Sequence, residues 1–468
     1  MQRDYPISKI IKQLERSDLI PAIVFRTSRR GCDMDLQQLA RKSYNKADPE
    51  QTEAIREKVD SLCEQHGWER ELIVNNLQYK VLLSHAAGAH HAGQLLTWRL
   101  LLEELMSAGM LRLLIATGTV AAGVDFPART VVVTAHSKRG HDGFNVLTAS
   151  EFQQMSGRAG RRGKDTVGFC LMAPSPFCDA RVLAKVSESP PEPLRSAYFA
   201  SPSTVLNLLK YRSVEELRFT VQNSLAGFVD EGEAVEQREF ANQEEERLST
   251  LEEESREYKK LFKKVRRLRR KADERAAQQL TQLELTLSAL VKLNFITTEG
   301  VLTEKGHWAA ELCTNLVLEL AEAIENFMFS DVSSIELVGL VASIAGDPYR
   351  NYLKVKNSKV SNQKFEQLSE LVENIADHYT PNANSSEVAV VSDAAATVET
   401  WVETKQWSDF TALLRLANVA DGDAARLIMQ TADHLQQISR LSESHPALAE
   451  LAVEARGLLL RPPLSDVV

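Results

Sequence analysis

The chain has 468 residues, a length typical of two to four domains. It is 44% hydrophobic and 25% charged, as in ordinary globular proteins. No apolar run approaches the roughly 18 residues that span a bilayer, and the first residues, MQRDYPISKI, lack the apolar segment of a secretory signal. Five cysteines without a CxxC pair disfavour a zinc site or disulfide framework and favour a reducing cytoplasm. At a net charge of −9, a nucleic-acid binder would have to cluster its basic groups.

The first part of the sequence alternates strand-like and helix-like stretches. Short apolar runs are typical of buried parallel strands, the more so when they are rich in β-branched residues. Four such runs occur, at residues 21–25, 111–117, 129–135 and 167–173. Because helical stretches separate them, residues 1–185 are predicted to form an α/β domain with a mainly parallel sheet.

After this region the sequence is mostly helical. The proline-rich stretch SESPPEPL at 187–194 is typical of a domain boundary. The pattern then predicts a segment at 190–243 that contains a capped helix start, a charged helix at 244–282 and a helical bundle at 283–468. The charged stretch opens acidic and ends basic, which suits the dipole of a single helix. The small polar residues of 381–397 predict that part of that segment is a loop.

The strongest chemical signal is the sequence QMSGRAGRRG at 154–163. Its glycines permit tight turns and close approach of the backbone. Its arginines, Arg158 and Arg161, offer planar cations to phosphate oxygens. In phosphoryl transfer such a group stabilises the charge on the γ-phosphate, an effect worth roughly 10³–10⁵ in rate. The competing interpretation is a surface loop that binds any anion.

A second glycine-containing segment, ATGTVAAGVDFP, follows a predicted strand at 116–127. Ligand-binding loops of α/β sheets lie at this kind of position. Its small hydroxyl residues and glycine let the backbone approach a sugar-phosphate chain. Asp125 could accept a hydrogen bond from a ribose hydroxyl, orient an arginine, or simply begin a turn or helix.

Two further segments carry polar residues of interest. The run IVFRTSRRGC at 23–32 places hydroxyl and arginine residues directly after a strand. A histidine pair, His90 and His91, precedes Ala92-Gly93. Adjacent histidines rarely bind the same ion and no third ligand has suitable spacing, so a metal site is disfavoured. A nucleic-acid backbone contact or a structural role is favoured instead.

Taken together, these segments resemble the second RecA-like domain of the superkiller (Ski)-like DExH-box RNA helicases of superfamily two. PAIVFRTSRRGCD resembles motif IV, HHAG the histidine-containing motif, ATGTVAAGVDFPARTVV motif V and QMSGRAGRRG motif VI. The resemblance continues beyond 185. Residues 201–228 are similar to the family's winged-helix segment, and 287–312 and 407–438 to its C-terminal helical domain, often called DSHCT.

The resemblance implies roles for individual residues. Those implied to contact the ATP phosphates or to lie on the nucleotide side are Gln154, Arg158, Arg161, Gly123 and Asp125. Those implied to contact nucleic acid are Thr27, Ser28, Arg29, His90, His91, Thr117 and Thr119. The implied fold is a RecA-like α/β domain followed by a winged helix and an all-α bundle. The implied activity is ATP-dependent 3′-to-5′ RNA unwinding in RNA processing or decay.

Two motifs of a complete motor do not occur in the sequence. There is no phosphate loop GxxxxGK[ST] and no DExH sequence after a strand. In the family both belong to a first RecA-like domain, which would hold most of ATP and Mg²⁺. We therefore expect a C-terminal half-motor that is inactive alone. Its expected partners are that domain, single-stranded RNA or a 3′-tailed duplex, and an RNA-decay nuclease, with no membrane.

Two other functions remain open. The chain could be a non-catalytic adaptor that binds RNA or a helicase, although an adaptor has no need of the arginine pair. It could also act on DNA, as other helicases of the superfamily do. The basic stretch 259–271, in which nine of thirteen residues are Lys or Arg, is either an RNA-binding stripe or a solvated helix face paired with nearby acids.

Overall fold

A computed structural model describes most of the chain. The described residues are 5–41, 46–118, 128–140, 143–176, 178–194, 196, 198–253, 255–354, 358–379 and 388–465. They divide into two compact units. The first contains Met1–Pro193, Thr404–Arg426 and Arg461–Val468, and the second Leu194–Glu403 and Leu427–Leu460. The first unit therefore includes two segments from the C-terminal part of the sequence.

The first unit is built on a five-stranded parallel sheet with the order β2-β3-β1-β4-β7. The strands are β1 (Ala22–Phe25), β2 (Ala87–His90), β3 (Leu113–Ala116), β4 (Thr130–Val133) and β7 (Phe169–Met172). The predicted mainly parallel sheet is confirmed, and each of the four apolar runs contains one strand. Strand β2 was not predicted from the sequence.

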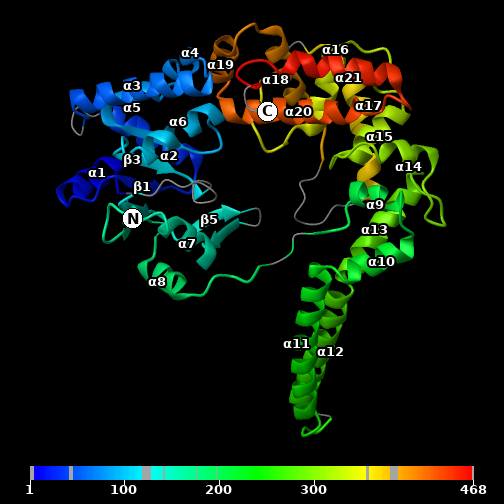
Figure 1. The fold of residues 1–468 in the computed structure, drawn as a ribbon. Coiled ribbons are helices and arrows are strands. Elements are labelled where there is room, and N and C mark those ends of the chain that lie inside the picture. The colour runs from blue at the N-terminus through cyan, green and yellow to red at the C-terminus, as the bar shows by residue number, and fades with distance from the viewer. Residues whose placement is uncertain are drawn as a thin grey trace. The chain divides into compact units, whose positions relative to one another are not determined.

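Helices cover both faces of this sheet (Figure 1). They are α1 (Ile7–Arg16), α2 (Arg29–Ala40), α3 (Pro49–His66), α4 (Arg70–Val74), α5 (Tyr79–His85), α6 (Leu96–Ser107), α7 (Ala149–Ser156) and α8 (Ala180–Glu188). Side chains alternate between two cores, as the period of a strand requires. Ile23 and Phe25 pack with α3 and α6 on one face, whereas Ala22 and Val24 pack with α1 and α2 on the other.

Two smaller elements complete the first unit. After β4, the antiparallel strands β5 (Ser137–Gly140) and β6 (Gly143–Val146) form a two-stranded sheet. The C-terminal segment contributes α19 (Trp407–Leu416) and the first residues of α20 (Asp421–Ile438), which continues into the second unit. The two-stranded sheet was not predicted from the sequence, whereas α19 and α20 lie within the stretch 283–468 that was predicted to be helical.

The second unit is helical. Its elements besides the hairpin described below are α9 (Pro202–Leu209), α10 (Val214–Gln222), α13 (Gln278–Lys292), α14 (Glu304–Ala309), α15 (Val317–Glu325), α16 (Ser334–Ala345), α17 (Asn362–His378), α18 (Ser392–Glu403) and α21 (Pro446–Leu459). Helices α9 and α10 both pack on α13, and Ile296 pairs with Leu302 in an antiparallel bridge after it. The winged helix stays a prediction, as do the proposed domain boundaries.

The stretch 244–282, which the sequence suggested was one charged helix, is divided among three helices, and its last residues begin α13. Helix α11 (Leu225–Leu248) and helix α12 (Arg256–Ala276) pack along each other as a hairpin. Ser255 caps the second helix, because its side chain accepts a hydrogen bond from the Tyr258 amide at 3.0 Å. The acidic and basic halves therefore lie on opposing helices, where they form ion pairs with each other.

Within the described residues, no helix combines the length and the apolarity needed to cross a bilayer.

Candidate nucleotide and nucleic-acid site

Three of the segments singled out in the sequence meet at one edge of the sheet. The neighbouring strands β2, β3 and β1 run parallel, so their carboxyl ends lie together. The backbone joins these ends, since the Arg26 amide donates to the Ala116 carbonyl at 2.8 Å and the Thr117 amide to the His90 carbonyl at 3.3 Å. Ligands of parallel α/β sheets bind at this edge.

A cavity of about 320 Å³ opens at this edge. Its lining brings Thr27 and Gly118 together with Gln154 of α7, so three motifs that are distant in sequence share one hollow. Lys138 and Glu151 form an ion pair on its wall. Arg26 also lines it and is held by Asp35 at 2.6 Å. The cavity therefore mixes apolar walls with several groups that can bind a polar ligand.

The loop that carries the two arginines is anchored on both sides. Before it, α7 begins with a capping box in which Thr148 and Glu151 satisfy each other's backbone amides. Behind it, the Ala128 amide donates to the Arg158 carbonyl at 2.9 Å, and the Gly160 amide donates to the Ala128 carbonyl at 2.7 Å. Gly160 has φ +92°, where a side chain would be strained. The loop is thus fixed against the entrance to β4.

Close packing behind the loop requires a second glycine. A Cβ atom on Gly168 would lie 2.5 Å from the carbonyl carbon and oxygen of Ala159. These are backbone atoms, which cannot move aside as a flexible side chain could. The backbone that precedes β7 therefore supports the backbone of the arginine loop directly.

Arg161 is held in a fixed orientation by Asp165. Its Nε donates to Oδ2 at 2.8 Å and its Nη2 to Oδ1 at 2.9 Å, while its backbone amide donates to Oδ2 at 2.9 Å. Hydrogen bonding to Arg161 lowers the pKa of the Asp165 carboxyl to about 2, so the pair stays charged at neutral pH. Such a two-point contact fixes the plane of the guanidinium group.

The other predicted nucleotide-side residues differ in their exposure and in whether the structure describes them. Gln154 is exposed and lines the cavity. Arg158 is half-buried in the anchored loop. Gly123 and Asp125, like the predicted nucleic-acid residue Thr119, lie outside the described residues. The nucleotide-side roles of all of them stay predictions.

Two of the predicted nucleic-acid residues after β1, Ser28 and Arg29, already have partners in the structure. The Ser28 hydroxyl caps α2 by accepting from the Gly31 amide at 3.0 Å. Arg29 Nη1 donates to both carboxylate oxygens of Asp423 at 2.8 Å, in the first turn of α20. The Gly422 amide beside it donates to the Gly93 carbonyl at 3.1 Å. A phosphate would have to compete with Asp423 for Arg29.

The histidine pair lies in the interior of the first unit. His90 and His91 are only 4% and 3% exposed. His90 Nε2 lies 2.7 Å from a carboxylate oxygen of Glu103 in α6, and His91 Nε2 lies 3.0 Å from one of Asp33 in α2. Among the described residues there is no group of three or more His, Cys, Asp or Glu side chains that could hold a metal ion. The rings tie helices to the sheet edge, and their contact with nucleic acid stays a prediction.

Sequence reasoning missed the partner carboxylates of this site. Asp165 follows Arg161 by four residues, a spacing that could have suggested a local pair. Asp423 is 394 residues from Arg29, and nothing in the sequence pattern links them. Local ion pairs could therefore have been found from the sequence, whereas the long-range pair required the fold.

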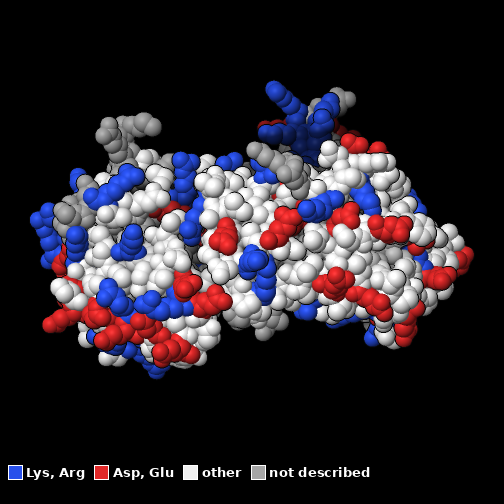
Figure 2. Space-filling model, turned by 90° about the horizontal axis from the view of Figure 1, so that it is seen from above, with Lys and Arg blue, Asp and Glu red and all other residues white. Residues whose placement is uncertain are grey.

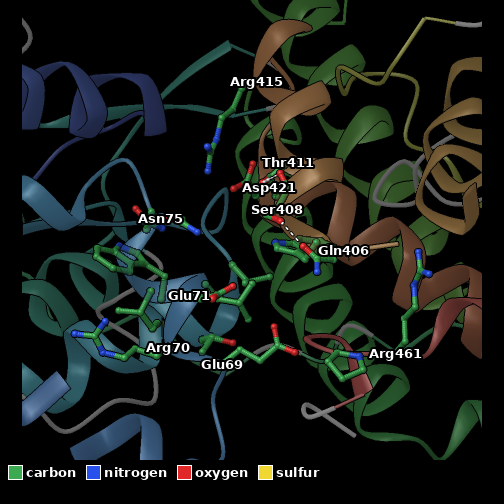
Figure 3. A pocket seen from close by; sticks show the side chains of 18 of the residues that line it. Glu69, Arg70, Glu71, Asn75, Gln406, Ser408, Thr411, Arg415, Asp421 and Arg461 are labelled. Atoms are coloured by element: carbon green, nitrogen blue, oxygen red, sulfur yellow. Dashed lines mark hydrogen bonds between the residues drawn. The ribbon is translucent and has the colours of Figure 1, made fainter. Parts of the chain in front are cut away.

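A larger cavity, of about 610 Å³, lies elsewhere in the first unit (Figure 3). Residues from Glu69 to Asn76 form one wall, and residues from Lys405 to Asp421 form the other. None of the predicted site residues is among those that line it. Figure 3 shows Asp421 and Arg415 projecting from the second wall. Burial raises the pKa of the Asp421 carboxyl to about 6, although Arg415 acts against the shift.

The Asp421 carboxyl predicts a pH-dependent stability difference. Below pH 4 it is protonated in both the folded and the unfolded chain, whereas above pH 6 the folded state holds a buried charge. We expect Asp421→Asn to raise the free energy of unfolding by about 3 kcal/mol at pH 7.5, with the gain shrinking between pH 6 and 4. Urea unfolding at both ends of this range measures it. Asp433→Asn, exposed on the same helix, is the control, and an equal gain in both variants would refute the argument.

Comparison with known proteins places this site in context. Residues 299–466 match the model of the DSHCT (NUC185) domain. The chain is 31% identical over 220 residues to the probable helicase HelY of Mycobacterium tuberculosis. It is 33% identical over 221 residues to the DExH-box ATP-dependent RNA helicase DExH10 of Arabidopsis thaliana, and 30% over 213 residues to the exosome RNA helicase MTR4 of Mus musculus.

These matches cover only part of each protein. They include 47%, 47% and 45% of this chain, but 24%, 22% and 20% of the respective relatives. The matched region thus spans less than a quarter of the length of these relatives. The match supports a helicase-family function for the chain. It does not transfer the activity of a whole relative to the chain.

Proposed function

We propose that this chain, which belongs to the Ski-like DExH-box helicases of superfamily two and corresponds to their C-terminal part, supplies half of an ATP-dependent RNA helicase motor. In this motor a first RecA-like domain and this chain's RecA-like unit enclose ATP between them. The chain contributes the arginines that face the phosphates, the loops that contact RNA and the DSHCT domain that guides the strand.

The observation that carries the proposal is the meeting of motifs at the sheet edge. Thr27, Gly118 and Gln154 line one cavity, although they come from three separate segments. The anchored loop beyond Gln154 presents Arg161 with its guanidinium plane fixed. A surface loop that binds any anion would need neither the shared cavity nor the fixed orientation.

The chain's own groups suggest how it would act on ATP. When bound, Mg²⁺ neutralises charge on the phosphate oxygens. Gln154 would contact the phosphates, and Arg158 and Arg161 would stabilise the charge that develops on the γ-phosphate when the two domains close. Because Asp165 fixes Arg161 beforehand, little reorganisation of that side chain would be needed at closure.

Contacts with RNA are proposed along the adjoining loops. Thr27, Ser28 and Thr117 lie at or beside the carboxyl ends of β1 and β3, within reach of a backbone that crosses this edge. Three relatives whose names state their substrate are RNA helicases, which favours RNA over DNA. We further propose 3′-to-5′ movement, a role in RNA processing or decay beside a nuclease, and a cytoplasmic location.

The experiment compares ATP hydrolysis by this chain alone with hydrolysis after it is joined to a first RecA-like domain that carries the phosphate loop and DExH motif. We expect RNA-stimulated hydrolysis only in the joined protein, and unwinding of a 3′-tailed RNA duplex in preference to a DNA duplex. RNA binding with no hydrolysis in either form would favour the adaptor. Preferential unwinding of DNA would favour the DNA helicase.

A further inference from the structure

The hairpin of α11 and α12 separates its charges between the two helices. Helix α11 carries eight acidic and two basic residues, whereas α12 carries eleven basic and three acidic ones. Two helices of opposite charge attract each other along their length, but each also has a face turned away from its partner. The chemistry of these outer faces is not explained by the hairpin itself.

The facing sides of the two helices are joined by apolar packing and by ion pairs. Small apolar residues are buried between them, among them Ala234, Ala241, Val265 and Ala272. Lys264 pairs with the buried Glu244 at 3.0 Å and lowers the pKa of that carboxyl. Arg275 pairs with Glu233 at 2.8 Å, and Arg269 pairs with Glu245. The acidic residues of α11 that reach α12 therefore form ion pairs with the basic residues on its facing side.

The opposite side of α12 keeps its positive charge. Lys259, Lys263, Arg266 and Arg270 recur at intervals of four, three and four residues, so they form one stripe, which we call the outer basic face. All four are exposed. Among the described residues, the only ion pair of this stripe joins Arg270 to Glu274 on the same helix, at 3.3 Å. At about 1.5 Å per residue the stripe extends over roughly 16 Å.

The surroundings of the outer basic face add to its charge. Lys260, Arg267 and Lys271 flank it and are also exposed. Phe262 lies beside it with 48% of its surface exposed, stacked on Tyr258 at a ring distance of 6.2 Å. Figure 2 shows Lys and Arg side chains gathered where the hairpin is seen end-on. An exposed aromatic ring among basic groups can bind single-stranded nucleic acid, because an unpaired base stacks on it.

We propose that the outer basic face binds the phosphate backbone of RNA. This inference rests on the proposed function only in taking RNA as the ligand, and it adds a contact site outside the RecA-like unit. A protein partner fits less well, because half of this stripe is Lys, and the centres of protein interfaces are depleted in Lys and rich in aromatic groups. A row of cations with one aromatic side chain fits a polyanion instead, since each phosphate that it neutralises releases counterions.

The test uses the full chain and a fluorescein-labelled single-stranded oligouridine RNA. The variant replaces Lys259, Lys263, Arg266 and Arg270 with glutamine, which keeps a high helix propensity. The control replaces four exposed basic residues of the first unit with glutamine: Lys12, Arg16, Arg56 and Lys80. Both variants lose the same charge. Fluorescence anisotropy is measured from about 50 to 200 mM salt, and circular dichroism checks that the hairpin stays helical.

We expect the outer-face variant to bind at least tenfold more weakly than the control variant at low salt. Its plot of log affinity against log salt should be flatter by about 3, since each lost single-strand phosphate contact removes about 0.7. A 4-thiouridine photocrosslink to the peptide 256–276 is expected in the unaltered chain and lost in the variant.

Equal affinities and slopes for the two variants would overturn the inference while leaving RNA binding by the chain intact. No RNA binding by the unaltered chain would instead remove the proposed function. If light scattering showed a dimer that only the outer-face variant breaks, with RNA affinity equal to that of the control, the face would belong to a second copy of the chain, whose acidic α11 it would meet, and the RNA assignment would be wrong.

Discussion

Replacing Arg161 with alanine is expected to lower RNA-stimulated ATP turnover by about 10³-fold or more in the joined two-domain motor. The guanidinium is already oriented by Asp165, so its loss removes a preorganised charge from the site. Steady-state hydrolysis with saturating RNA measures the effect. Lys164→Ala, an exposed basic residue in the same loop, should remain near the unaltered rate. A similar loss in both variants would show that general loop charge, and not this side chain, matters.

The role of Asp165 itself is separable from that of Arg161. We expect Asp165→Asn to lower kcat by about tenfold to a hundredfold, because misplacing a reacting group by about 1 Å has an effect of that size. The KM for ATP should change less than kcat if Asp165 acts by orienting Arg161. A rise in kcat would mean that the carboxylate competes with the γ-phosphate for the guanidinium, and would reverse the assignment.

The sheet could be predicted from the sequence because four of its five strands lie in short apolar runs. The run Arg129–Ala135 is typical, with three consecutive valines that are all buried. Strand β2 was not predicted because its sequence, AGAH, consists mainly of small residues. Its Gly88 lies against Leu102, where a Cβ would come within 2.5 Å of a methyl group. Tertiary packing, and not local propensity, makes this segment a strand.

The site was predictable to the extent that its chemistry lies within short motifs. Gln154 and the arginine loop could be recognised locally, whereas the cavity that Gln154 of α7 shares with Thr27 depends on the fold. The ion pair of Arg29 with Asp423 and the burial of His90 depend on contacts between distant segments. Charge order along 244–282 suggested one helix with a favourable dipole, but the ion pairs between α11 and α12 showed that the same order also suits a hairpin.

Replacing Glu322 with alanine is expected to destabilise the second unit strongly. Its carboxylate lies 2.5 Å from the ammonium of Lys305, whose side chain is 9% exposed. The ammonium also donates to the Leu293 carbonyl at 3.0 Å and lies 4.4 Å from the centre of the Phe295 ring. Removing the carboxylate leaves a buried charge without its counterion, which costs about 3–5 kcal/mol of unfolding free energy.

The matched variants for Glu322 test whether the cost arises from the orphaned charge. Glu325→Ala on the exposed side of the same helix should cost less than about 0.5 kcal/mol. The double change of Lys305→Met with Glu322→Leu should recover most of the loss, since buried ion pairs are replaced by apolar pairs at little cost. Urea unfolding of the full chain measures all three. If the double variant were as unstable as Glu322→Ala, the cost would come from lost packing around α14 and α15, and the charge argument would fail. A recovered double variant would show that the loss in Glu322→Ala comes from the orphaned Lys305 charge, and that an apolar pair can stabilise this core as well as the ion pair does.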